Sequence, residues 1–141
     1  MANLYTTKAT ALAGRNGQVA TDDGLLSVSL AYPKEMGGNG NATNPEQLFA
    51  AGYSACFSNA ILHVAREAKI ALKSAPVTAE VGIGANAQGG FELTVSLAAQ
   101  LDLPDEQAIE LVKTAHQVCP YSNATRGNID VKVSANGKSL A

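Results

Sequence analysis

The longest stretch of apolar and small residues lies in the middle of the chain, between Asn44 and Pro76. Asn44 suits the N-cap of a helix, and Pro45 suits the first helical position, where its missing N–H costs nothing. The pattern that follows predicts a helix of about 25 residues, which is roughly 37 Å long at 1.5 Å per residue. Its first half carries almost no charge and many small side chains. We therefore expect a central, enclosed helix.

The chain before this helix predicts short strands joined by turns. Alternation of side chains indicates strands at residues 4–11, 18–21 and 26–32, with glycines marking the turns between them. The first turn carries Arg15 at its tip. Residues 33–43 contain a glycine-rich run without helical or strand periodicity, which predicts a loop.

The chain after the central helix predicts a hairpin, a second helix and a last strand. Apolar residues alternate over 77–84 and 91–99, and a glycine-rich turn joins these two segments as an antiparallel pair. Pro104 opens a helix that Pro120 closes, because a residue before proline is steered away from helical dihedrals. A loop over 121–128 and a strand over 129–133 complete the predicted elements.

The order β-β-β-α-β-β-α-β predicts an α+β fold, organised as a single domain over residues 1–141. One-faced antiparallel strands cover only one side of a helix. The central helix is apolar on more than one face, so we expect an intertwined homodimer in which two such helices lie side by side.

The composition excludes several classes of function. The chain has 141 residues, a net charge of −2 and no tryptophan, so nothing favours nucleic acid or an anionic membrane as a partner. The first residues lack a basic segment followed by an apolar one, and no uncharged apolar run approaches membrane-spanning length. We expect a reducing cytoplasm, where Cys56 and Cys119 do not form a standing disulfide but can form a transient one.

From the residues alone, the two cysteines can be interpreted either as buried small hydrophobes or as nucleophiles. Cys119 falls at a predicted helix C-terminus, where the negative end of the dipole disfavours a thiolate. Cys56 is mid-helix and gains little from the dipole, so its activation needs a nearby cation. Arg15 and Arg126 are the candidates placed on loops rather than on solvated helix faces, although loop arginines are commonly only solvated.

Glu46 lies in the first turn of the central helix, where a carboxylate complements the dipole without any catalytic role. About ten helical residues, or roughly 15 Å, separate it from Cys56, so the two cannot touch within one straight helix. If they share a site, Arg15 bridges part of the gap or Glu46 comes from a second subunit.

Two other arrangements of the histidines and cysteines remain open. A metal site would combine His63, His116, Cys56 and Cys119, although no Cys-x-x-Cys or His-x-x-x-His spacing supports it. A Cys–His hydrolase is equally weak, since His63 lies about 10 Å along the helix from Cys56, beyond hydrogen-bond reach.

Two long motifs carry a resemblance to a known family. Residues 44–57 read Asn-Pro-Glu-Gln-Leu-Phe-Ala-Ala-Gly-Tyr-Ser-Ala-Cys-Phe, and residues 116–128 read His-Gln-Val-Cys-Pro-Tyr-Ser-Asn-Ala-Thr-Arg-Gly-Asn. The chain resembles the organic hydroperoxide resistance proteins of the OsmC/Ohr superfamily, over essentially its whole length. The second motif is typical of the hydroperoxide-resistance branch rather than of the osmotically induced branch.

The resemblance implies a cysteine-based peroxidase with an OsmC-like fold. Cys56 would be the peroxidatic cysteine and Cys119 the resolving one, while Arg15 and Glu46 would hold the thiolate. It also implies an obligate homodimer with interface active sites, and an external dithiol reductant, a lipoylated protein or dihydrolipoamide, in place of a bound cofactor or metal. The alternative is a non-catalytic ligand-binding stress protein of the same superfamily with inert buried thiols. The residues expected to line the site for an organic hydroperoxide are Phe49, Tyr53, Phe57 and Tyr121.

Overall fold

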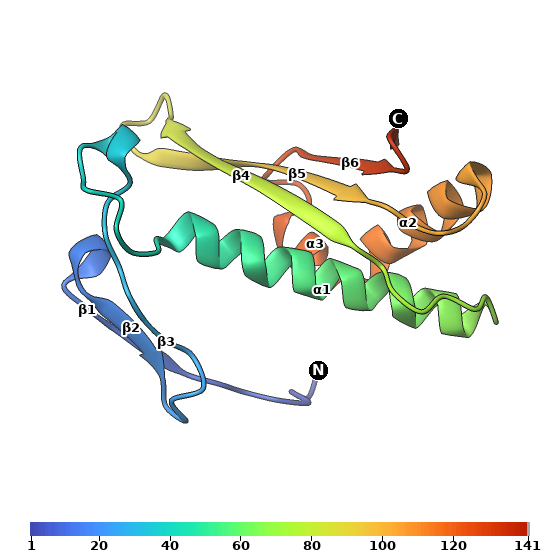
Figure 1. The fold of residues 1–141 in the computed structure, drawn as a ribbon, viewed down its shortest axis with the longest axis horizontal. Helices are drawn as coiled ribbons and strands as arrows, with labels where there is room; N and C mark the ends of the chain where they lie inside the picture. Colours follow the sequence, from blue (N-terminus) through green and yellow to red (C-terminus); the bar gives the residue numbers. More distant parts are fainter. Residues whose placement is uncertain (141) are drawn as a thin grey trace. The chain divides into compact units, whose positions relative to one another are not determined.

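The computed structural model describes residues 1–140, and the chain divides into two compact units. The first unit covers Met1–Leu48, and the second begins at Phe49. Strands and helices follow one another in the predicted α+β order, with four short additions: two 3₁₀ turns, an extra helix and a final two-residue strand. Figure 1 follows these elements along the chain.

The first unit is a three-stranded antiparallel sheet in the order β1-β2-β3. The strands are β1 (Ala9–Leu12), β2 (Gln18–Thr21) and β3 (Ser27–Ser29). A 3₁₀ turn, η1 (Gly14–Asn16), connects β1 to β2. Gly17 follows this turn, and the position requires glycine because a Cβ there would lie 1.5 Å from the backbone oxygen of Leu12. Residues 4–8, predicted as part of the first strand, lie outside β1, and a second 3₁₀ turn, η2 (Lys34–Met36), occupies the predicted loop.

The long helix α1 spans Pro45–Glu67 and begins where its capping residue predicts. The side-chain oxygen of Asn44 accepts a hydrogen bond of 2.9 Å from the backbone N–H of Gln47. The helix ends well before Pro76 because Lys69 adopts a left-handed conformation with φ 57°. The backbone N–H groups of Lys69 and Ile70 then bond to carbonyls of the last turn, which is a Schellman ending.

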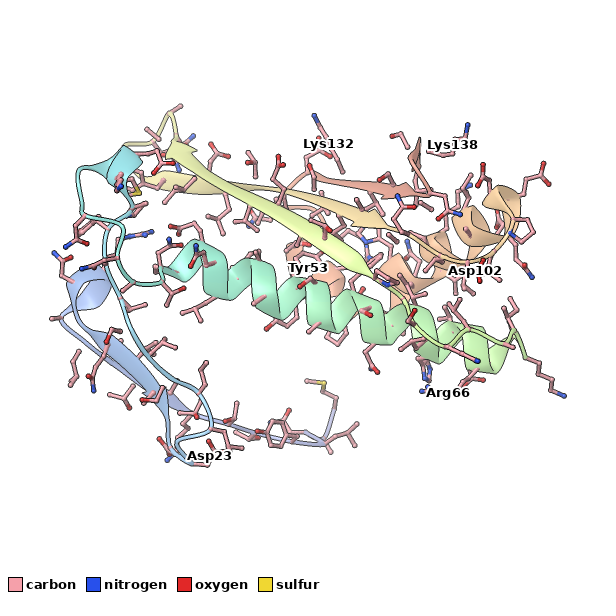
Figure 2. All side chains as sticks on the ribbon, viewed as in Figure 1. Asp23, Tyr53, Arg66, Asp102, Lys132 and Lys138 are labelled. Carbon is pink, nitrogen blue, oxygen red and sulfur yellow. The ribbon has the colours of Figure 1, made fainter. Side chains whose placement is uncertain are left out.

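The second unit packs helices against one face of a four-stranded sheet in the order β4-β5-β6-β7 (Figure 1). The core joins alternate residues of β5 and β6 to the inward faces of α1 and α2, and Lys132 points from β6 away from the helices (Figure 2). The elements are β4 (Val77–Ala85), β5 (Phe91–Ala99), α2 (Asp105–Val118), α3 (Pro120–Thr125), β6 (Val131–Ala135) and β7 (Lys138–Ser139).

Besides the short strand β7, two features of the second unit differ from the sequence prediction. The predicted loop after Pro120 is largely a helix, α3, because Cys119 is extended and Pro120 occupies the first position of a new helix. The last predicted strand, β6, runs parallel to β5, whereas we expected antiparallel strands throughout. The segment formed by α2 and α3 serves as the crossover that a parallel pair requires.

The apolar character of α1 corrects the expectation that no uncharged apolar run approaches membrane-spanning length. By length and composition alone it could cross a membrane, since an 18-residue window within it has a mean hydropathy of 1.3. One such helix is weak evidence, because the core helix of a soluble protein passes the same test. Tyr53, Phe57 and Ile61 are completely buried on one side of α1, whereas Ala51 and Ala55 are exposed on another.

Candidate active site

The two cysteines of the second unit lie side by side as free thiols. Cys56 is half-buried in the middle of α1, and Cys119 is fully buried at the junction of α2 and α3. Their Sγ atoms are 3.5 Å apart. Because the sulfur atoms are already in contact, a disulfide between them requires only a small movement.

Burial is the main influence on Cys56, and it raises the pKa of this thiol above 9.0. The backbone N–H of Tyr121 acts in the opposite direction by hydrogen bonding to the sulfur, while the neighbouring Cys119 raises the pKa further. This N–H donor was not predicted from the sequence. The signal was Pro120, which starts a helix and thereby directs the free N–H groups of its first turn outward. Within the second unit, burial and the neighbouring Cys119 therefore favour the neutral form of the Cys56 thiol.

An arginine–carboxylate pair forms in the first unit. The two terminal nitrogens of Arg15, on η1, donate hydrogen bonds of 2.7 and 2.8 Å to the two carboxylate oxygens of Glu46. Both side chains are largely shielded, with exposed fractions of 21% and 15%. The hydrogen bonds from Arg15 hold the pKa of Glu46 below 4.5, so the pair is ionised. The guanidinium also lies 6.0 Å from the ring of Tyr32, a neighbour that the sequence did not indicate.

Aromatic rings gather around α1 on the side of the cysteines. The ring of Tyr121 lies 5.6 Å from that of Tyr53 and 6.2 Å from that of Phe49. Phe57 continues the row, 6.5 Å from Tyr53. Tyr53 and Phe57 are completely buried in the core, whereas Phe49 is half-buried and Tyr121 remains 38% exposed. Of the four predicted lining residues, only Phe49 and Tyr121 are thus accessible from outside.

A glycine of α1 makes room for Tyr121. A Cβ at Gly52 would lie 2.8 Å from the Tyr121 hydroxyl and 3.2 Å from its ring. The missing Cβ at Gly52 thus lets the Tyr121 side chain approach α1 closely, one turn from Cys56. The same residue therefore contributes a ring beside Cys56 and a backbone N–H to its sulfur.

A group of polar side chains beside the cysteines, which we call the hydroxyl clamp, was not foreseen from the sequence. Its members are Tyr53, His116, Ser122 and Thr125. The Ser122 hydroxyl lies 2.8 Å from the Tyr53 hydroxyl and 2.8 Å from Nδ1 of His116. Tyr53, labelled in Figure 2, reaches from α1 to α3 through this contact. Burial, and secondarily Arg126, lower the pKa of His116, which is therefore neutral at neutral pH.

The histidines have partners other than a metal. His63 lies 3.7 Å from Glu67 on the exposed side of α1, and His116 belongs to the hydroxyl clamp. Among residues 1–140, no three His, Cys, Asp or Glu side chains gather as a metal site requires. Neither histidine is paired with a cysteine in the described part of the chain.

Comparison with known proteins gives the class of this fold and site. A profile described as OsmC-like protein matches residues 38–134, most of the chain, which therefore belongs to the OsmC-like family. Its relatives narrow this to the organic hydroperoxide resistance proteins. OhrB of Bacillus subtilis is 46% identical over 92% of this chain and 96% of its own length. The corresponding protein of Xanthomonas axonopodis pv. citri is 48% identical over 93% of this chain and 94% of its own.

Solved structures agree with this assignment. An organic hydroperoxide resistance protein from Vibrio cholerae O1 biovar eltor, with captopril bound in one of its active sites, matches with a TM-score of 0.98. It is 72% identical, and the match covers 99% of this chain and 97% of that one. The crystal structure of OhrB of Bacillus subtilis matches with a TM-score of 0.86 at 44% identity, over 94% of this chain and 99% of that one. The predicted family and fold class are confirmed.

Proposed function

We propose that this protein is a thiol-dependent peroxidase that reduces organic hydroperoxides to alcohols. The observation that carries the proposal is the 3.5 Å separation between the sulfur atoms of Cys56 and Cys119. One thiol is accessible and the other buried, which suits a peroxidatic and a resolving cysteine. The names of the relatives from Bacillus subtilis and Xanthomonas support a role in organic hydroperoxide resistance.

The first step requires a thiolate on Cys56. Its sulfur attacks the terminal peroxide oxygen, the O–O bond breaks, and the alkoxide leaves and takes up a proton to become the alcohol. Since burial raises the pKa of Cys56, a thiolate there needs a nearby cation. The guanidinium of Arg126 is already bonded to the Asn123 side chain and the His116 carbonyl. Arg15 is the cation that we propose to stabilise both the thiolate and the departing alkoxide. Glu46 orients its guanidinium through two hydrogen bonds.

The second step removes the sulfenic acid formed on Cys56. The Cys119 sulfur attacks the Cys56 sulfur, the S–S bond forms, the S–O bond breaks, and the hydroxide leaves as water with the Cys119 proton. The sulfur atoms must approach by about 1.5 Å to reach the ~2.05 Å length of a disulfide. A short path to closure protects Cys56 from irreversible oxidation.

We propose that the side chains of Phe49 and Tyr121 contact the organic part of the substrate. Both are aromatic and accessible, and Tyr121 lies beside Cys56. Tyr53 and Phe57 support them from within the core. The Vibrio cholerae relative binds captopril in one of its active sites, which is in keeping with a site for small organic molecules.

The accessibility of the two sulfurs favours an external dithiol as reductant. Cys119 is fully buried, so the first thiolate of the reductant must attack Cys56, and Cys119 leaves as the thiol. The second thiol of the same molecule then releases Cys56 and completes the two-electron reduction. A lipoyl group, on a protein or as dihydrolipoamide, supplies two such thiols, and a reducing cytoplasm is the compartment we propose.

A homodimer with sites at its interface is part of the proposal. Exposed Ala51 and Ala55 on α1 allow a second helix to approach closely, and the β1 strand is exposed along its whole length. Both surfaces would be covered by a second copy. Sedimentation equilibrium measures the association directly, and an Ala55→Glu variant, which places a charge on that face, is expected to be monomeric.

The decisive experiment is stopped-flow oxidation by a fatty-acid hydroperoxide, with dihydrolipoamide as the reductant. We expect rapid turnover by the natural protein, none by Cys56→Ser, and a single turnover by Cys119→Ser with accumulation of sulfenic acid. Multiple turnover by Cys56→Ser would contradict the proposal. A protein with inert buried thiols would instead retain both free thiols after the hydroperoxide is added.

A further inference from the structure

The hydroxyl clamp joins the turns of the fold that lie next to the two cysteines. Tyr53 stands one helical turn before Cys56 on α1, and His116 stands one turn before Cys119 on α2. Ser122 of α3 contacts both, at 2.8 Å in each case. A single hydroxyl therefore ties together the three helical segments whose spacing sets the distance between the sulfur atoms.

One assignment of the protons satisfies every contact of the clamp. Each hydroxyl has one proton, and that of Thr125 is donated to the backbone carbonyl of Ser122 at 3.2 Å. The Tyr53 hydroxyl, 3.3 Å from the Thr125 hydroxyl, then donates to it, and Ser122 donates to Tyr53. His116 completes the series by donating from Nδ1 to Ser122. Every contact uses one proton, so the clamp is a continuous series of hydrogen bonds.

Burial makes this series a rigid part of the site. Tyr53 and Ser122 are completely buried and Thr125 is 6% exposed, so no water can replace a missing partner without opening the core. Among residues 1–140, no buried polar side-chain atom lacks a hydrogen-bond partner. Removal of the Ser122 hydroxyl would leave Tyr53 and His116 each short of one contact.

We propose that the Ser122 hydroxyl is the positioning group for disulfide closure, holding Cys119 within reach of the Cys56 sulfenic acid. The inference rests on the proposed function. Without the clamp, α3 and the end of α2 move more freely, and Cys119 spends less time near Cys56. Closure joins the Cys119 thiol to the Cys56 sulfenic acid with release of water. The competing reaction transfers an oxygen from a second hydroperoxide to the sulfenic acid, giving sulfinic acid and alcohol.

The test compares Ser122→Ala with Ser58→Ala as a matched control. Ser58, on α1, likewise donates a hydrogen bond from its hydroxyl, to the carbonyl of Ala75, but it lies outside the clamp. Each protein is equilibrated with mixtures of oxidised and reduced dithiothreitol, and the fraction of Cys56–Cys119 disulfide is measured. We expect the equilibrium constant for disulfide formation to fall about tenfold in Ser122→Ala, which is roughly 30 mV for a two-electron couple. Ser58→Ala should match the natural protein.

A second measurement follows the fate of the sulfenic acid. Cumene hydroperoxide is added in increasing amounts, and intact-mass spectrometry gives the share of sulfinic and sulfonic acid on Cys56. This share should rise severalfold in Ser122→Ala, and Ser122→Thr, which keeps the hydroxyl, should restore the natural value. An unchanged disulfide equilibrium together with unchanged over-oxidation in Ser122→Ala would overturn the inference.

Tyr53→Phe keeps the test decisive if Ser122→Ala fails to fold, because it removes one hydroxyl and retains the ring. Its disulfide equilibrium should shift in the same direction as that of Ser122→Ala, and no shift would refute the positioning role. The dithiothreitol equilibrium needs no peroxide. If the natural protein consumed no hydroperoxide, the proposed function would therefore fail, while this equilibrium would still decide the role of the clamp.

Discussion

The two units of the chain differ in how they exclude water. In the second unit, two helices and a four-stranded sheet enclose a continuous core that includes Ile61, Leu97 and Val112, all at most 1% exposed. In the first unit, every residue of β1 is exposed, and the side chains of Leu12 and Leu25 are 58% and 89% accessible. The second unit is organised around apolar packing, and the first around backbone pairing and one shielded ion pair.

This difference matches the division of chemistry that we propose between the units. The thiols need precise spacing, and they lie where packing and the hydroxyl clamp fix the backbone. Arg15 and Glu46 form an ion pair, and they lie in the unit whose β1 strand is exposed along its length. A sheet with so little core is stabilised chiefly by what covers it, which is one reason for proposing a second copy.

The largest expected effect separates the units by stability. Ile61→Ala removes fully buried volume from the second unit and should lower the free energy of unfolding by about 2–5 kcal/mol. Leu25→Ala, in the exposed turn before β3, should change it by no more than ~0.5 kcal/mol. Urea denaturation followed by circular dichroism measures both. Equal losses would show that Leu25 is buried in solution, and the contrast between the units would then disappear.

The next effect concerns the charge that we propose the first unit supplies. Arg15→Ala should raise the pKa of Cys56 by about 1–3 units, or roughly 1.4–4 kcal/mol, if the guanidinium stabilises the thiolate. The rate of hydroperoxide consumption should fall accordingly. Thiolate absorbance against pH, recorded in a Cys119→Ser background, measures this pKa. Lys8→Ala is the matched control, because Lys8 belongs to the same unit but pairs with Asp22 in an exposed ion pair.

A smaller effect concerns Gly52. Gly52→Ala should displace the Tyr121 ring, since the new Cβ would lie 2.8 Å from its hydroxyl. The backbone N–H of Tyr121 then moves from the Cys56 sulfur, and the pKa of Cys56 should rise by less than about one unit. The helix itself gains up to ~1 kcal/mol from replacing glycine, so a raised pKa in a protein of undiminished stability identifies the lost N–H contact. An unchanged pKa would mean that Tyr121 adjusts by its ring alone.

Local signals in the sequence predicted the helices and strands better than the way they pair. The start of α1 was predictable because Asn44 and Pro45 act on the adjacent backbone. The direction of β6 was not, since alternating side chains look the same in parallel and antiparallel strands. The helix after Pro120 was missed because a proline both ends one helix and starts the next.

For the candidate site as well, the sequence predicted individual residues better than the contacts between them. The two motifs contain both cysteines and the carboxylate, while Arg15 lies outside them and was implied by the family resemblance. The contact between Arg15 and Glu46 and the one between the two sulfurs depend on residues far apart in the chain. The members of the hydroxyl clamp lie within the two motifs, but their contacts with one another could not be predicted, because only burial gives the hydroxyls of Ser122 and Thr125 a role.

The smallest effect separates the units by their response to acid. In the second unit, the pKa of His116 is lowered from 6.5 by burial and then by Arg126. Neutral His116 therefore contributes stability that is complete above pH 6.5 and is lost as the pH falls below it. In the first unit, the pKa of Glu46 is lowered from 4.5 by Arg15, so its contribution is complete above pH 4.5 and is lost below it. Hydrogen exchange resolved by residue should thus show the second unit loosening at a higher pH than the first. Glu46→Gln should abolish only the lower stage, and a single transition shared by both units would contradict the contrast.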